Sequence, residues 1–282
     1  MRKYPQHQSG FVVMSLLVAT AVIGMMIYLG FSNDISRITG TQLEAERQEW
    51  IVDNGKALDE WYLRNAWVID SNSLAINFTT IASQAGITLK YSAQLVSSTR
   101  LNRNGVSYHV IAMWLPQTGL TGTAFDVNTG LITEGTYSSA SIPRLKYHIT
   151  NGATIESQLV TKSLKTMAQA STRLETWFIG QAAVATSADV NNNWFRQPSC
   201  AATADPRFLP CLAGFQDAGP VFTTAAMGAA SDLVSAWGRG LLMTNDPTLV
   251  STTHPYSVLL QAETPWGTPL QATVTESTNL TL

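Results

Sequence analysis

The feature that most constrains this chain is an uninterrupted apolar run near its start. Residues 11–31, FVVMSLLVATAVIGMMIYLGF, contain no charged side chain. At about 1.5 Å of rise per residue, a helix of this length reaches across a hydrocarbon core of about 30 Å. Arg2 and Lys3 are the only formal charges before Asp34, and positive residues stay on the cytoplasmic side. The run therefore predicts one membrane span, with the rest of the chain on the far side.

The apolar run has three interpretations. A secretory signal peptide needs a small-x-small cleavage site, which 19–21 (Ala-Thr-Ala) supplies, but cleavage there leaves an apolar stub on the product. A permanent anchor on a periplasmic domain needs nothing beyond the run itself. The third interpretation uses the junction Ser9-Gly10-Phe11.

A short basic leader that ends in Gly and is followed by Phe and an apolar run resembles the N-terminus of a type IV prepilin. The resemblance covers about residues 1–66. It implies that 1–10 are a leader, that a prepilin peptidase cuts after Gly10, and that Phe11 becomes the methylated first residue. It also implies that the apolar segment packs in the core of a helical filament, where Gly24 falls at the place of a helix-loosening glycine in many pilins.

Ser15 departs from the family pattern. Type IV pilins usually place Glu at this fifth mature position, where it pairs with the terminal amine of a neighbouring subunit, because a carboxylate in hydrocarbon is costly unless paired. Ser15 cannot neutralise that amine. By lacking the Glu, the chain resembles pilin-like subunits that start or cap a filament. The alternative is that Ser15 only donates a hydrogen bond to a carbonyl of its own helix.

Beyond the apolar run the chain stays helical in pattern. Leu43, Ile51, Leu58 and Tyr62 recur at spacings of eight, seven and four, which forms one apolar stripe. The sequence predicts a helix over 11–66, with a membrane-spanning half at 11–31 followed by an amphipathic half.

Residues 67–155 are predicted to form a first β-rich lobe. Asn104-Gly105, between two apolar segments, is a strong hairpin signal. The strand candidates are 87–91, 107–114, 123–127 and 144–150. They predict one antiparallel sheet of about four strands.

A second helix-plus-sheet lobe is predicted over 156–282. A helix is expected over about 155–186, with an apolar stripe at Val160, Leu164, Met167, Ser171, Leu174 and Phe178. Strand candidates follow at 220–224, 256–262 and 270–275. The segments 58–63 and 174–179 resemble each other 116 positions apart, which raises the hypothesis of a duplication. The predicted class is α+β, with a long N-terminal helix packed on an antiparallel outer domain.

Cys200 and Cys211 are the only cysteines. Charged residues are 13% of the chain, about half the usual share, which suits a domain displayed outside the cytosol. Two thiols in such an oxidising compartment predict a disulfide. Without a second pair or a CxxC motif, a zinc site or a redox centre is not expected.

No motif for catalysis or for a cofactor is present. The four histidines show no ligand spacing, and the nucleophile, metalloprotease, dinucleotide and Walker motifs are absent. Asp189, Asn191 and Asn193 alternate like calcium ligands, but Trp194 stands where the loop needs Gly. A net charge of −2 without a basic block disfavours nucleic acid. We expect no enzyme, no cofactor and no metal.

The resemblance implies a minor type IV pilin-like subunit at or near a pilus tip, acting in assembly initiation and adhesion. Implied partners are the major pilin and other minor pilins, the prepilin peptidase, the inner-membrane assembly platform and a surface receptor or glycan. The chain is expected in the bacterial inner membrane before extraction, and then in a pilus at the cell surface. The alternatives are a minor pseudopilin of type II secretion and a permanently anchored periplasmic binding or enzymatic domain.

Overall fold

The computed structural model describes residues 9–186, 191–200 and 205–276. Over residues 9–39, the described side chains are those at 20–23, 25 and 26. The chain divides into two compact units, Met1–Asn54 and Gly55–Leu282.

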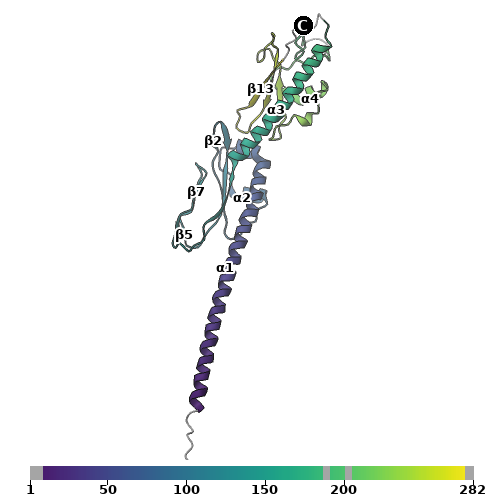
Figure 1. Ribbon diagram of the computed structural model, residues 1–282. Helices are drawn as coiled ribbons and strands as arrows, with labels where there is room; N and C mark the ends of the chain where they lie inside the picture. Colours follow the sequence, from purple (N-terminus) through teal and green to yellow (C-terminus); the bar gives the residue numbers. More distant parts are fainter. Residues whose placement is uncertain (1–8, 187–190, 201–204, 277–282) are drawn as a thin grey trace, which may run out of the picture. The chain divides into compact units, whose positions relative to one another are not determined.

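Helix α1 (Ser9–Ser71) is one uninterrupted helix (Figure 1). It continues past the predicted end at Ala66. Of the predicted apolar stripe, Leu58 and Tyr62 are fully buried and Ile51 is 2% exposed. Leu43 is 46% exposed, so the prediction that the stripe begins there is wrong.

The predicted span at 11–31 lies largely outside the described side chains. Within the part that was described, no helix combines the length and the apolar character needed to cross a membrane. Gly10, Phe11, Ser15 and Gly24 all fall within the bounds of α1. The surroundings of these four residues lie outside the described part of the chain.

The first sheet has the order β1-β4-β9 and is antiparallel. Its strands are β1 (Gln94–Ser97), β4 (Val110–Leu115) and β9 (Lys146–Asn151). Every residue of the central strand β4 is buried, as expected for a strand covered on both faces. In register, Trp114 of β4 lies opposite Gln94 of β1 and Tyr147 of β9.

Short two-stranded ribbons accompany this sheet. They pair β2 (Leu101–Arg103) with β3 (Val106–Tyr108), β5 (Leu120–Thr121) with β8 (Thr136–Tyr137), and β6 (Ala124–Asp126) with β7 (Leu131–Thr133). The prediction of a single sheet of about four strands is therefore wrong. The predicted strand at 87–91 is also wrong: helix α2 (Phe78–Ala85) precedes it, and Tyr91 and Ser92 adopt positive φ in a turn.

Helix α3 (Gly152–Ala183) confirms the second long helix. Its buried face differs from the predicted stripe in the first half, where Leu164 is 45% exposed. The residues buried on this face are Gly152, Glu156, Leu159, Ser163, Met167, Ala170, Leu174, Phe178 and Ala182. Glu156 and Ser163 are polar and are buried because other segments hydrogen-bond to them, which hydrophobic periodicity cannot show.

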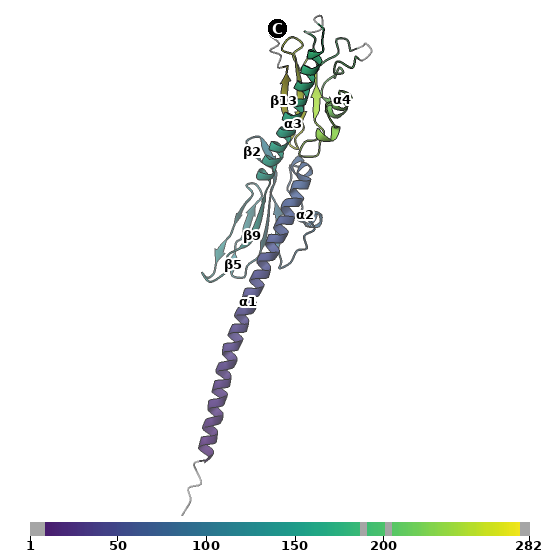
Figure 2. The ribbon, with the colours of Figure 1, turned by 45° about the vertical axis from the view of Figure 1, so that its right-hand side comes forward.

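The second sheet is antiparallel in the order β10-β11-β12-β13. Its strands are β10 (Gln216–Asp217), β11 (Leu242–Thr244), β12 (Ser257–Ala262) and β13 (Leu270–Thr275). Helix α3 lies along β12 and β13 (Figure 2). Their shared core contains Leu174, Phe178, Trp194, Phe222 and Leu260.

The predicted strand at 220–224 is instead the helix α4 (Ala218–Thr224), which is followed by the 3-10 turn η1 (Ala230–Asp232). Asp217 caps α4, because its Oδ1 accepts a hydrogen bond from the Gly219 N–H at 2.9 Å. Pro220 lies in the first turn, where its missing N–H has no helical partner to lose. The side chain of Phe222 is fully buried, so tertiary packing overrides the β-branched composition of this segment.

The predicted disulfide between Cys200 and Cys211 is confirmed, with the two Cα atoms 5.6 Å apart. The buried side chain of Asn245 holds the same region. Its Nδ2 donates to the carbonyls of Phe195 and Pro210 at 2.6 and 2.7 Å, and its Oδ1 accepts from the Leu212 N–H at 2.8 Å. The disulfide segment is thus tied to β11 through the residue that follows this strand.

Replacing both Cys200 and Cys211 by Ser is expected to lower the free energy of unfolding by about 3 kcal/mol, because the open chain gains conformational entropy when unfolded. Urea unfolding of the variant and of the oxidised protein measures the difference. Reducing the natural protein should reproduce the loss, and reductant should leave the variant unchanged. Equal unfolding midpoints for the variant and the oxidised protein would contradict this expectation.

The two long helices bury residues at matching positions. Ile51, Leu58, Tyr62 and Ala66 of α1 are buried, and so are the residues 116 positions later, Met167, Leu174, Phe178 and Ala182. Each helix is followed by an antiparallel sheet, β1-β4-β9 after α1 and β10-β11-β12-β13 after α3, but α2 precedes the first sheet whereas α4 lies between β10 and β11. These matches agree with a duplication, which stays a hypothesis.

Candidate functional site

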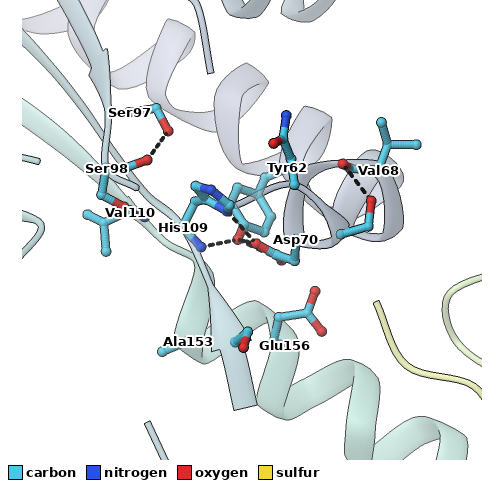
Figure 3. Close-up of polar contacts among 12 residues, drawn as sticks. Tyr62, Val68, Asp70, Ser97, Ser98, His109, Val110, Ala153 and Glu156 are labelled. Atoms are coloured by element: carbon cyan, nitrogen blue, oxygen red, sulfur yellow. Dashed lines mark hydrogen bonds and ion pairs between the residues drawn. The ribbon is translucent and has the colours of Figure 1, made fainter. Parts of the chain in front are cut away.

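A cluster of polar side chains lies buried within the unit Gly55–Leu282. The junction cluster, as we call it, consists of Tyr62, Asp70, His109 and Glu156, all with zero solvent exposure. It brings together the last turns of α1, the residue between β3 and β4, and the second turn of α3 (Figure 3). Three segments distant in sequence therefore meet at one polar centre.

Asp70 is the acceptor at the middle of the junction cluster. The Tyr62 hydroxyl donates to its Oδ1 and Oδ2, at 2.7 and 2.8 Å. The His109 Nδ1 lies 2.9 Å from Asp70 Oδ1, and the His109 backbone N–H donates to the Tyr62 hydroxyl oxygen at 2.9 Å. These contacts satisfy groups that would otherwise be costly to bury.

Burial shifts the pKa of Asp70, His109 and Glu156 toward the neutral form of each side chain. Burial, reinforced by Asp70, raises the pKa of Glu156 to about 9, so this carboxyl is protonated at neutral pH. Burial also raises the pKa of Asp70 to about 6, although the neighbouring Glu156 carboxyl and the hydrogen bonds from Tyr62 oppose the rise. Burial lowers the pKa of His109 to about 4. One proton held on Glu156 relieves the repulsion between two buried carboxyls.

Gly152 is required where α3 begins against this cluster. A Cβ at Gly152 would lie 2.2 Å from the His109 carbonyl oxygen and 2.2 Å from the Tyr62 hydroxyl. The Gly152 N–H also donates to the His109 carbonyl at 3.1 Å. Only a residue without a side chain permits this approach.

The turn before β11 closes the other side of the cluster. The Trp237 Nε1–H donates to Glu156 Oε2 at 2.9 Å, and the Ala236 N–H donates to the Ser163 hydroxyl at 2.9 Å. The Arg239 guanidinium lies 4.6 Å from the ring centre of Trp67, near the end of α1. The cluster is closed to solvent, and these contacts join α1, α3 and the turn before β11 around it.

A solvent-accessible groove of about 750 Å³ lies between the β2–β3 hairpin and the first turns of α3. We call it the basic groove. It is lined by Arg103, Asn104, Val106, Tyr108, Asn151, Ala153, Thr154, Ser157, Gln158, Thr161, Lys162 and Lys165. The lining contains three cationic side chains and no carboxylate.

Local sequence explains both walls of the basic groove. Asn104 and Gly105 adopt φ values of 55° and 81°, as a tight two-residue hairpin turn requires, so the predicted hairpin is confirmed. Asn151 caps α3, because its Oδ1 accepts from the Ala153 N–H at 3.1 Å. Lys162 and Lys165 are three residues apart on α3 and share one helix face.

A second, acidic hollow of about 370 Å³ adjoins the groove and shares three of its lining residues. Asp59 and Glu60 line it, and Asp59 Oδ1 lies 3.0 Å from His148 Nε2 and accepts from the Thr150 hydroxyl at 2.6 Å. Burial raises the pKa of Asp59, but these hydrogen bonds outweigh burial and hold the pKa below its usual value.

The other predicted candidates have structural partners or lie outside the described residues. Asp189 is among the latter, and Asn193 Oδ1 accepts from the Phe195 N–H at 3.1 Å. In the described ranges, no group of three or more His, Cys, Asp or Glu is placed to hold a metal. Each of the eight tryptophans is buried or half-buried, so they form no exposed aromatic platform.

The chain matches no model of a known protein family, no curated protein and no solved structure. Sequence reasoning missed the basic groove and the roles of Asp70 and Glu156. The one signal for the groove is the spacing of Lys162 and Lys165, since Arg103 lies far from them in the sequence. For Glu156, the signal is its helical spacing from the buried Leu159 and Ser163.

Proposed function

We propose that this chain is a minor type IV pilin-like subunit that acts at or near a pilus tip, in assembly initiation and in recognition. The observation that carries the proposal is α1, which runs without interruption from Ser9 to Ser71. This helix begins next to the Gly10-Phe11 junction and ends in the buried core around Leu58 and Tyr62. The helix thus continues in sequence from the uncharged run into the unit that contains both sheets.

In this proposal, residues 11–31 hold the precursor in the bacterial inner membrane, with the outer domain in the periplasm. The prepilin peptidase then removes 1–10 and Phe11 is methylated. The assembly platform extracts the helix, which packs beside the helices of the major pilin and other minor pilins. Small residues such as Gly24 favour this helix packing. Lipid provides no hydrophobic driving force between helices, and small residues let two helices approach closely enough for van der Waals contact.

Ser15 supports a place at the tip. A shaft subunit needs a carboxylate at this depth to neutralise the terminal amine of its neighbour, since an unpaired charge is costly there. A subunit that starts the filament has no neighbour above it and does not need the carboxylate. The second sheet, with its disulfide-closed segment, adds an outer surface for recognition in an oxidising compartment.

The processing step tests the proposal. In cells with an active prepilin peptidase, the mature chain should begin at methylated Phe11. Gly10→Val should leave essentially all of the protein at precursor length, because the peptidase requires the small residue at its cleavage site. N-terminal sequencing and intact mass measure both outcomes.

The control is Ser9→Ala, which keeps Gly10 and should be processed normally. A chain from native cells that retains Met1 would contradict the proposal and favour the permanently anchored periplasmic domain. Mass spectrometry of sheared surface fibres distinguishes a tip pilin from a minor pseudopilin of type II secretion. A tip pilin co-purifies with pili, whereas a minor pseudopilin does not.

A further inference from the structure

We propose that the basic groove binds an acidic oligosaccharide, with its carboxylate groups against Arg103, Lys162 and Lys165. This inference rests on the proposed recognition role and names the class of ligand that the outer domain takes. The groove lies wholly within the unit Gly55–Leu282. No residue of the unit Met1–Asn54 lines it.

Charge is the first argument. Arg103, Lys162 and Lys165 are exposed, and no Asp or Glu lines the groove with them. Three cations with no carboxylate in the same lining create a positive potential inside a concave surface, where low-dielectric walls focus the field. The planar Arg103 guanidinium suits bidentate contact with a carboxylate, and the two lysines supply point charges.

The remaining lining favours a sugar over a bare inorganic anion. The Ser157 hydroxyl donates to the Ala153 carbonyl at 2.7 Å, and the Thr161 hydroxyl donates to the Ser157 carbonyl at 2.8 Å. With their protons engaged, both oxygens remain acceptors for ligand hydroxyls. Gln158 and Asn104 add amide donors and acceptors, and a half-buried Tyr108 offers an aromatic ring.

Size and surroundings limit the ligand to a short oligosaccharide. A volume of about 750 Å³ falls within the range of small-ligand sites. The adjoining hollow carries Asp59 and Glu60, and these carboxylates repel a long polyanion that would continue past Asn151. The charge of the surface thus changes from positive in the groove to negative in the adjoining hollow. This change disfavours nucleic acid, which is negatively charged along its whole length, and favours a ligand that ends or is neutral at the hollow.

Isothermal titration of the full-length chain in a neutral detergent tests the inference with three probes: trigalacturonic acid, neutral maltotriose and inorganic phosphate. Trigalacturonic acid should bind at least about tenfold more tightly than either of the others. Replacing Lys162 and Lys165 together by Gln should weaken its binding about tenfold or more, since two charge-assisted contacts are lost. Arg103→Gln should act in the same direction.

The matched control is Lys90→Gln, which removes an exposed lysine outside the groove and should leave the affinity unchanged. Thermal unfolding midpoints should be equal for all variants. The inference would be overturned if trigalacturonic acid did not bind, or if maltotriose or phosphate bound as tightly as it does. It would also be overturned if Lys90→Gln lost as much affinity as the groove variants. These results are independent of cleavage after Gly10, so failure here is distinguishable from failure of the proposed function.

Discussion

Asp70→Ala is expected to lower the free energy of unfolding by about 4 kcal/mol at pH 7, because truncating one member of a buried polar network strands its partners. The Tyr62 hydroxyl loses both acceptor oxygens, at 2.7 and 2.8 Å, and the His109 Nδ1 loses its partner at 2.9 Å. All three side chains are fully buried, so water does not replace these contacts. Urea unfolding monitored by tryptophan fluorescence measures the loss.

The informative comparison is Asp70→Asn, which keeps the shape and one acceptor oxygen and should cost about 1 kcal/mol. Glu60→Ala is the surface control, since Glu60 is exposed on the same helix and should stay within about 0.5 kcal/mol of the natural protein. A loss below about 1 kcal/mol for Asp70→Ala would contradict the central role of this carboxyl. A loss for Asp70→Asn as large as that for Asp70→Ala would show that the charge matters more than the hydrogen bonds.

The secondary structure that could be predicted from sequence is the part that depends on local signals. Asn104-Gly105 predicts the hairpin because a tight two-residue turn needs positive φ at both of its central residues, and Asn followed by Gly is the pair that adopts it most readily. The strand expected at 270–275 coincides with β13, where apolar and polar residues alternate. Helix α3 was recognisable because Met167, Leu174 and Phe178 keep helical spacing over several turns.

The errors occur where tertiary contacts decide. The segment 220–224 has β-branched and aromatic residues, yet it is helical because Asp217 caps it and Phe222 fills the core. The first half of α3 buries Glu156 and Ser163, whose partners Trp237 and Ala236 lie more than seventy residues away. No local pattern contains that information.

The candidate sites depend on tertiary structure in the same way. The four histidines show no ligand spacing, and nothing in the sequence pairs His109 with Asp70. The basic groove is assembled from a hairpin tip at Arg103 and a helix face at Lys162, and only the fold places them together. The disulfide was predictable because Cys200 and Cys211 leave a single pairing.

Glu156 is expected to make the protein less stable as the pH rises. Burial raises the folded-state pKa of Glu156 to about 9, whereas an unfolded glutamate loses its proton near its ordinary pKa. Between these values the unfolded state ionises and the folded state does not, so stability falls by up to about 1.4 kcal/mol per pH unit. The raised pKa of Asp70, about 6, acts in the same direction at lower pH.

Glu156→Gln removes this titration while its amide oxygen still accepts from Trp237 Nε1. Relative to the natural protein, the variant should gain about 4 kcal/mol in free energy of unfolding between pH 5 and pH 9. Urea unfolding at each pH unit measures the difference. Burial lowers the pKa of His109 to about 4. Below the unfolded-state pKa of this histidine, both proteins therefore lose stability, and this loss cancels when the variant is compared with the natural protein.

A double-mutant cycle assigns the effect to the pair of carboxyls. In an Asp70→Asn background, the neighbouring charge that reinforces the raised pKa of Glu156 is gone, so the gain of Glu156→Gln with pH should shrink. Glu60→Gln, on the exposed surface, should give a curve parallel to that of the natural protein. Parallel curves for Glu156→Gln as well would mean that the folded protein ionises Glu156 normally, and the junction cluster would then not hold a proton between its two acids.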